Sequence, residues 1–325
     1  MLAAVEPYPG TPSPERTSET MATATPMKAP TPATPQASIE DSERIRARAR
    51  RRRLISLLKH AGLIALSLVM VYPLIWLLLS SFRPTELIFR DQGLVFTDIS
   101  LDNYVEGWNA QRFAFGHFLK NSGLLVLGSI LGNLISCSLA AYAFARLKFR
   151  GKTLFFAAML ATIMLPVHVI IVPQYVIFSQ LGWVNTFIPL ILPKFLATDA
   201  FFVFLMVQFI RGIPKELDEA ARIDGAGHLR IFFQIILPLM VPALATTAIF
   251  TFIWTWSDFF GQLIYLTKQE NWTVSLALRG FLDSSSSSNF GGMFAMSVLS
   301  LLPLFIAFLI GQRYLIKGIA TTGIK

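Results

Sequence analysis

Long apolar stretches separated by short polar segments dominate the sequence from residue 54 onward. A helix that crosses the hydrocarbon core of a membrane needs about 20 mostly apolar residues. Six stretches are long enough, and we predict membrane-spanning helices at residues 55–81, 117–145, 153–179, 187–210, 239–264 and 291–315. The predicted fold class is therefore an all-α polytopic membrane protein with six transmembrane helices.

Proline and glycine are frequent in these stretches. In a soluble helix an interior proline is disruptive, whereas in a membrane neighbouring helices can satisfy the carbonyl groups that it frees. The prolines concerned therefore do not argue against spans; they are Pro73, Pro166, Pro173, Pro189, Pro193 and Pro303. Three glycines in the second stretch, Gly123, Gly128 and Gly132, predict close approach of another helix.

Composition and charge support the membrane class. Apolar residues make up 54% of the 325 residues and charged residues only 14%, with a mean hydropathy of +0.57; an ordinary soluble domain has about 25% charged residues. The net charge of +9 does not indicate nucleic acid, because the basic residues flank apolar segments. Cys137 is the single cysteine, so no intrachain disulfide is possible. No metal site is expected, because metal-ligand spacing is absent among His60, His117, His168 and His228.

The N-terminal segment has a different composition. Residues 1–43 are rich in Pro, Thr, Ser and Ala, which predicts a disordered tail because little apolar surface can be buried. The arginine-rich run Arg44–Arg53 follows and directly precedes an apolar stretch, which favours retention on the cytoplasmic side over a cleaved signal peptide. We thus expect a tail at 1–53 and a six-helix membrane domain at 54–325.

Loop charge predicts the orientation. Basic residues collect before span one, in the loop 146–152, in the loop 211–238 and after span six. The alternate loops 82–116 and 263–290 are poorer in excess positive charge, and the run Ser284–Ser288 reads as a flexible external loop. By the positive-inside rule both termini and the loop 211–238 are cytoplasmic. The predicted location is the plasma (inner) membrane, crossed several times.

The loop between spans four and five, residues 212–238, is named here the docking loop. Pro214 is suited to open a short helix, and Gly225 to end it in a left-handed conformation. Negative charge in the first turn favours this helix through Glu216, Asp218 and Glu219. A second helix is expected from Ala226 to Leu237, with Pro238 opening span five.

Two roles suit such a loop. It could rest on lipid headgroups as an amphipathic connector, or it could dock on a partner protein. The paired alanines Ala220 and Ala221 form a thin ridge that can enter a groove, and no Trp or Phe precedes Phe232. The pattern favours docking on a partner.

The docking loop resembles a known signature. Glu219-Ala220-Ala221, three residues, Gly225, nine residues and Ile235-Ile236-Leu237-Pro238 are similar to the EAA signature of ABC importer membrane subunits. The stretches "IPKELDEAARIDGA" and "LPLMVPALATTAIFTFIWTWSDF" resemble carbohydrate-type permeases, specifically the second membrane subunit of the maltose system. The resemblance covers residues 54–325.

The resemblance implies a role for the loop and a set of partners. The loop would dock as a coupling helix on a cytoplasmic ATPase, with Glu219 paired to a basic residue there and Gly225 allowing the bend; Asp224, Leu237 and Pro238 complete the site. Implied partners are a second six-helix permease, two copies of the ATPase subunit and an external solute-binding protein. The implied solute is a sugar, or alternatively glycerol phosphate or a polyol.

Chemistry within the chain is not expected. The phosphate-binding pattern G-x-x-x-x-G-K-[ST] is absent, so ATP and Mg²⁺ would be bound by the partner ATPase, and this chain carries no cofactor and is not an enzyme. A self-contained secondary transporter or channel should show inverted repeats or a filter motif. An intramembrane serine hydrolase should show G-x-S-x-G. None of these patterns is found in the sequence.

A solute path is suggested by polar groups in span five. A charge at the centre of a membrane helix costs roughly 2.5–3.5 kcal/mol on insertion scales, so Asp258 stands out. Trp254, Trp256 and Gln262 lie near it in sequence, and aromatic faces with polar groups suit a sugar ring. Equally, the tryptophans could anchor the helix at the interface with Asp258 among headgroups. Lys194 and Asp199 are expected to pair or to sit at the outer mouth, in a structural role.

Overall fold

The computed structural model describes residues 35–90, 99–282 and 289–320, with side chains from residue 50 to residue 312 within these ranges. The chain divides into two units, Met1–Leu68 and Val69–Lys325, which are described separately. Every regular element in the described ranges is helical, which confirms the all-α prediction. The tail segment 1–34 and the run Ser284–Ser288, predicted as flexible, lie outside the described residues.

The first helix, α1 (Pro35–Ser80), begins in the first unit and ends in the second. Its portion Arg50–Ser80 is long and apolar enough to cross a membrane, in keeping with the predicted span at 55–81. The helix starts well before the arginine run ends, so residues 35–53 are helical although they were predicted as part of the disordered tail. Strong helix formers explain this, since Arg and Ala dominate the second half of that segment.

The second unit holds the remaining helices. As far as the end of the fourth predicted span these are η1 (Thr85–Leu87), α2 (Asp102–Asn109), α3 (Phe115–Arg146), α4 (Lys152–Thr162), α5 (Val167–Gln180), α6 (Ile188–Ile191), η2 (Leu192–Leu196) and α7 (Ala200–Arg211). They are followed by α8 (Glu216–Ile223), α9 (His228–Ile231), the π-helix η3 (Phe232–Ile236), α10 (Leu237–Leu239), α11 (Val241–Ser257), α12 (Phe260–Tyr265), η4 (Gln269–Asn271), α13 (Val274–Gly280) and α14 (Phe290–Ala320).

Four segments have the length and composition of a membrane span: Arg50–Ser80, Phe115–Arg146, Ile188–Arg211 and Phe290–Gln312. Two further helix pairs pass the same test but are sharply bent. The α4–α5 pair bends by 102°, and the pair formed by His228–Leu239 and α11 bends by 74°. The described residues therefore contain four spans, or up to six if each bent pair is one span.

The predicted spans three, four and five are not continuous helices. In span three the helix stops before Pro166, whose ring cannot continue the hydrogen-bonded ladder. In span four Ala197 adopts a left-handed conformation with φ 55°, between η2 and α7. In span five Asp258 is extended, with ψ 115°, between α11 and α12. Non-helical backbone at such positions is tolerated where protein groups satisfy it.

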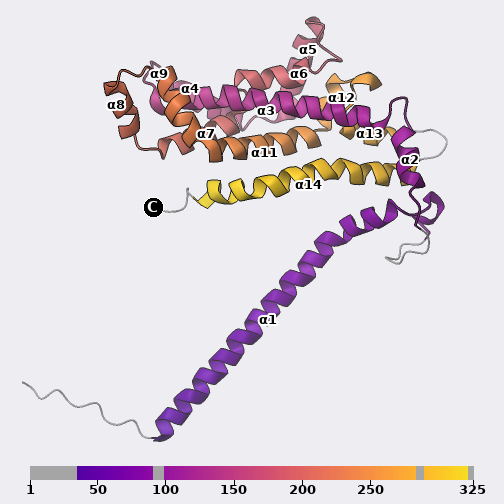
Figure 1. Ribbon diagram of the computed structural model, residues 1–325, viewed down its shortest axis with the longest axis vertical. Coiled ribbons are helices and arrows are strands. Elements are labelled where there is room, and N and C mark those ends of the chain that lie inside the picture. Colours follow the sequence, from indigo (N-terminus) through magenta and orange to yellow (C-terminus); the bar gives the residue numbers. More distant parts are fainter. Residues whose placement is uncertain (1–34, 91–98, 283–288, 321–325) are drawn as a thin grey trace, which may run out of the picture. The chain divides into compact units, whose positions relative to one another are not determined.

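Helices α3, α7, α11 and α14 pack side by side as the centre of the second unit (Figure 1). Helices α11 and α14 are antiparallel, because Trp256 Nε1 donates to the Ser300 carbonyl and Gly311 lies against Ile249 near the other end. Gly128 and Gly132 of α3 face α6 and η2 so closely that a Cβ at either would lie within 2.9 Å of a neighbouring atom. The predicted close approach is confirmed for these two glycines. It is wrong for Gly123, because a Cβ added there would meet no other described atom within 4 Å.

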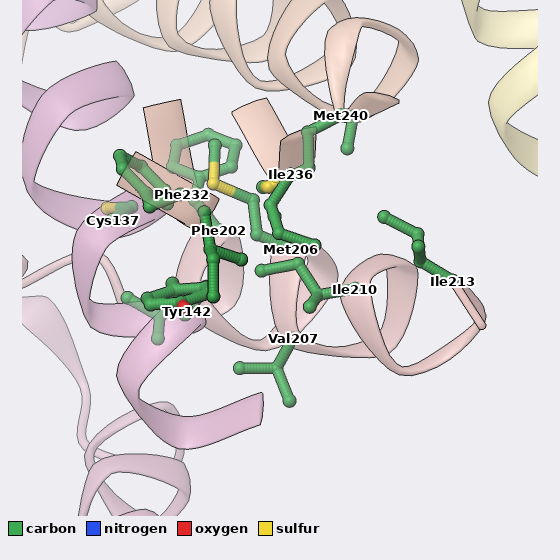
Figure 2. Packing of buried hydrophobic residues seen from close by; sticks show 14 residues of the cluster. Cys137, Tyr142, Phe202, Met206, Val207, Ile210, Ile213, Phe232, Ile236 and Met240 are labelled. Carbon is green, nitrogen blue, oxygen red and sulfur yellow. The ribbon is translucent and has the colours of Figure 1, made fainter. Parts of the chain in front are cut away.

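A cluster of buried apolar side chains joins α3 and α7 to the docking loop (Figure 2). Tyr142 of α3 lies against Phe232 of η3, with ring centroids 5.2 Å apart. Phe202, Met206 and Ile210 of α7 fill the space between. The second half of the docking loop is thus anchored in the core, because Phe232 and Ile236 of η3 are buried against α3 and α7.

The loops segregate to the two ends of the second unit. Arg146, at the end of α3, donates to the carbonyl of Ile213, which joins the two loops expected to be cytoplasmic. At the other end Gln111 donates to the carbonyl of Ala277, which joins the two loops expected to lie outside. Figure 1 shows α8 and α9 at the first end and α2 and α13 at the second. Which end faces the cytoplasm stays a prediction.

Candidate coupling loop and solute path

The docking loop has the predicted order of helix, glycine and helix. The first helix is α8, and it ends at Gly225, whose φ of +79° is the left-handed conformation that a glycine adopts without strain. The Ala226 N–H closes the turn by donating to the Ala221 carbonyl at 2.9 Å. The second helix begins at His228 rather than at Ala226, and Pro238 lies inside α10, before the bend, instead of opening span five.

The short helix α8 has two different faces. Asp218 is buried, and Ala221 packs against the apolar cluster of Figure 2. Glu219 and Ala220 are exposed, as is Asp224 at the end of the helix. Large apolar side chains are also exposed beside them, with Ile223 at 88% and Leu229 at 69%. The loop thus presents an apolar surface with charged neighbours, while its other side is fixed to the protein.

An ion pair that the sequence analysis missed holds this helix in place. Arg146 Nε lies 3.0 Å from Asp218 Oδ2, and the two side chains are only 3% and 5% exposed. The Arg146 Nη2 group donates to the Ile213 carbonyl at 2.6 Å. The available signals were an arginine that closes a span and an acid next to Glu219 in the signature. Neither signal identifies the partner, because the contact joins distant parts of the chain.

A second polar cluster lies between α3, α7 and α11. Lys194 Nζ lies 2.9 Å from Asp199 Oδ2, which confirms the pairing expected for these residues. Asn133 Nδ2 donates to the same Asp199 oxygen at 2.7 Å and to Thr251 Oγ1 at 3.0 Å. Ser136 donates to the Lys194 carbonyl at 2.6 Å. These bonds satisfy the polar groups around the interruption of span four, in keeping with a structural role.

Asp258 and Trp254 are both partly accessible at the surface of the second unit. Asp258 is partly buried at the break after α11, where its Oδ1 accepts a hydrogen bond from the Gly261 N–H at 3.0 Å. Trp254 is 48% exposed and packs on Phe202, with ring centroids 5.1 Å apart. Both residues were predicted to line the solute path, and their partial exposure leaves that prediction open.

Trp256 and Gln262 have contacts within the protein that account for their presence. Trp256 is buried, and its indole N–H donates to Ser300 at 3.1 Å. Gln262 is 1% exposed; its Nε2 donates to the Thr255 carbonyl at 2.9 Å and its Oε1 accepts from Thr273. The structure does not bring these two side chains to an accessible surface with Asp258, because both are turned into the packing between helices.

No group of three His, Cys, Asp or Glu side chains that could hold a metal ion is found in the described part of the chain.

A family model described as a binding-protein-dependent transport system inner membrane component matches residues 125–321. The chain belongs to this family of transport permeases. The match contains the docking loop and the last four predicted spans.

Individual relatives of the permease support the assignment. It is 34% identical over 275 residues to the arabinooligosaccharides transport system permease protein AraQ of Halalkalibacterium halodurans, covering 84% of this chain and 97% of that protein. It is 32% identical over 266 residues to the trehalose/maltose transport system permease protein MalG of Thermococcus litoralis, covering 81% and 95%. The resemblance to carbohydrate-type ABC importer permeases is thereby confirmed.

A solved structure has the same fold as the permease. A chain of a bacterial ABC transporter involved in the import of the acidic polysaccharide alginate superposes with a TM-score of 0.74. The sequences are 22% identical, and the superposition covers 82% of this chain and 98% of the other. The two chains therefore share their arrangement of helices.

Proposed function

We propose that this permease is the membrane subunit of an ATP-driven ABC importer for a sugar or related solute, and that it forms half of the translocation pore. The second half would be another six-helix permease, and an external binding protein would deliver the solute. Two observations support the solute class: the relatives named above are permeases for arabinooligosaccharides and for trehalose and maltose, and they are matched over almost their whole length.

The exposed surface of the docking loop carries the proposal. Leu217, Ile223, Leu229 and Phe233 are exposed by 42%, 88%, 69% and 56%. Complete burial of one such side chain is worth about 1.5–3 kcal/mol. A partner that covers these side chains would therefore bind with a substantially more favourable free energy. Glu219, Arg222 and Asp224 are exposed beside them. An apolar centre with a charged rim is the usual composition of a protein–protein contact.

The partner proposed for this surface is a cytoplasmic ATPase subunit, with Glu219 paired to a basic residue. Two such subunits would serve the two permeases. ATP and Mg²⁺ are bound and used there, so this chain contributes motion and a pathway but no catalytic group. When the two ATPase subunits close on ATP, the docked α8 moves with them, and the membrane helices reorient around the solute. Gly225 allows α8 and α9 to change their mutual angle.

The solute path is proposed to pass Asp258 and Trp254. An aromatic face beside a carboxylate suits a sugar, whose ring is apolar on its faces and carries hydroxyl groups at its rim. Partial exposure of both residues, and the break in the helix at Asp258, support this position. Non-helical backbone at membrane depth is typical of segments that are buried in protein or line an aqueous cavity.

Reversal of one docking charge tests the proposal. The full chain is expressed with its partner permease, its ATPase subunit and its binding protein. Glu219→Lys is expected to leave the chain in the membrane, to weaken co-purification of the ATPase subunit, and to abolish uptake of radiolabelled trehalose, maltose and arabinooligosaccharides. Glu270→Lys makes the same charge change on an exposed residue at the opposite end of the second unit, and it should leave ATPase co-purification intact. Normal co-purification and uptake with Glu219→Lys would refute docking through this surface.

A further inference from the structure

The contact between the end of α3 and the beginning of α8 has features beyond those of a docking surface. Arg146 is the last residue of α3, and Asp218 lies in the first turn of α8. Their side chains are almost fully buried, with Nε and Oδ2 3.0 Å apart. A charge removed from water is costly unless it is paired and hydrogen-bonded, so either residue without the other would be strongly unfavourable. Separating α3 from α8 would therefore leave two buried charges unpaired, which is costly in free energy.

Arg146 contacts residues both before and inside the first turn of α8. Its Nε faces Asp218, whereas its Nη2 donates to the carbonyl of Ile213 at 2.6 Å, between α7 and α8. Arginine suits this task because its planar guanidinium group presents several donors in a fixed arrangement. One side chain at the end of α3 therefore fixes both the start and the direction of α8.

Different residues of α8 face the protein interior and the exposed docking surface. Asp218 and Ala221 face the protein, as their burial and packing show. Leu217 and Ile223 are exposed on the surface proposed to meet the ATPase. A force applied to the outer face thus reaches α3 through the Arg146–Asp218 pair, in addition to the apolar contacts of the cluster in Figure 2.

Helix α3 is placed to pass such a displacement on. Through Asn133 it is hydrogen-bonded to Asp199 at the start of α7 and to Thr251 of α11. The buried groups around Arg146 also include polar atoms without a hydrogen-bond partner in the described part of the chain: Arg146 Nε and Nη1, Asp218 Oδ1 and Tyr142 Oη. Buried polar groups without a partner lower the stability of the arrangement that contains them.

We propose that Arg146 and Asp218 form the positioning contact through which movement of α8 is transmitted to α3. The proposal rests on the proposed docking of α8 on an ATPase subunit. The Arg146–Asp218 pair would determine how much solute is transported per ATP hydrolysed. The exposed face of α8 would instead determine whether the ATPase subunit binds.

The test measures uptake and ATP hydrolysis together, in proteoliposomes that contain the complete importer and its binding protein, with radiolabelled trehalose, maltose and arabinooligosaccharides as probes. Asp218→Asn removes the charge with little change in shape, and is expected to cause a large loss in the amount of solute taken up per ATP hydrolysed, while the ATPase still co-purifies. Asp218→Glu keeps the charge and should retain most of the coupling. Glu270→Gln, at an exposed acid outside the docking loop, is the matched control and should be unchanged.

A double variant separates transmission from stability. Arg146→Met with Asp218→Leu replaces the buried pair by apolar side chains, a change that often preserves folding; we expect assembly with low coupling. Normal coupling in this double variant, or in Asp218→Asn, would overturn the positioning role even if docking is correct. If the wild-type chain neither retains an ATPase subunit nor takes up solute on ATP addition, the proposed function itself fails.

Discussion

Gly132 offers a test of the packing between α3 and the interrupted span four. Substitution by alanine would place a Cβ 2.9 Å from both Lys194 Cβ and Phe195 Cδ2, and 3.0 Å from the Lys194 carbonyl carbon. Ordinary van der Waals contact begins at 3.4 Å. Neither the Lys194 Cβ nor its backbone can move away by a simple rotamer change, so the segment Leu192–Leu196 must shift as a whole.

Gly123 provides the matched control for this substitution. It lies in the same helix, and a Cβ there meets nothing within 4 Å. Alanine in place of glycine favours a helix by roughly 0.5–1 kcal/mol at either position. That gain cancels when Gly132→Ala is compared with Gly123→Ala, and the difference isolates the steric effect. Overpacking of a well-packed site typically costs about 1–3 kcal/mol, which corresponds to a roughly 5- to 150-fold change in the ratio of folded to unfolded chains.

Fluorescence-detected size-exclusion chromatography after heating measures the difference on the tagged full chain in detergent. We expect Gly132→Ala to lose its monodisperse peak several degrees below Gly123→Ala, since about 1 kcal/mol shifts a melting temperature by roughly 2–4 °C for a domain of 150–250 residues. Equal melting of the two variants would refute the close packing of α3 against Lys194. A higher melting temperature for Gly132→Ala would do so as well.

Two further predictions concern topology and the solute path. In intact cells an impermeant thiol reagent should label Leu101→Cys and not Arg222→Cys, with no background from Cys137 because that residue is fully buried; labelling of Arg222→Cys alone would show the inverted orientation. Asp258→Asn and Gly261→Ala should both change the KM for solute uptake in the assembled importer, the latter because its Cβ would lie 2.6 Å from Asp258 Oδ2 and displace the carboxylate without removing its charge. Unchanged kinetics in both variants, with Gly123→Ala as control, would exclude Asp258 from the path.

Element positions could be predicted well because membrane thickness sets the length of an apolar segment. The expected helix at 117–145 corresponds to α3, Phe115–Arg146, within two residues at each end. Continuity could not be predicted in the same way. Pro166 and Pro73 are both prolines in apolar stretches, yet the helix ends before Pro166 and continues through Pro73. The outcome depends on tertiary contacts, which a proline in isolation does not reveal.

The candidate site was predictable where backbone geometry dictated the residue. Gly225 was expected at a left-handed turn and is found there. Side-chain directions were less accessible: span five is apolar on all sides, so nothing in its pattern distinguishes Trp254, which is half exposed, from Trp256, which is buried. The same limit hid the partner of Asp218, because the first turn of any helix accommodates an acid and only the fold brings Arg146 to it.

The π-helix η3 gives the signature spacing a geometric meaning. It occupies Phe232–Ile236, between the left-handed Gly225 and the bend after α10. A π-turn holds one residue more than the α-helical register, and one residue corresponds to about 100° of rotation and 1.5 Å of rise. A chain one residue shorter here would regain a regular helix, but would rotate His228 and Leu229 by about a quarter-turn around its axis. The number of residues between Gly225 and Ile235 therefore fixes the direction in which the exposed side chains of α9 point. In a relative with one residue more or fewer here, the aligned residues would face a different direction.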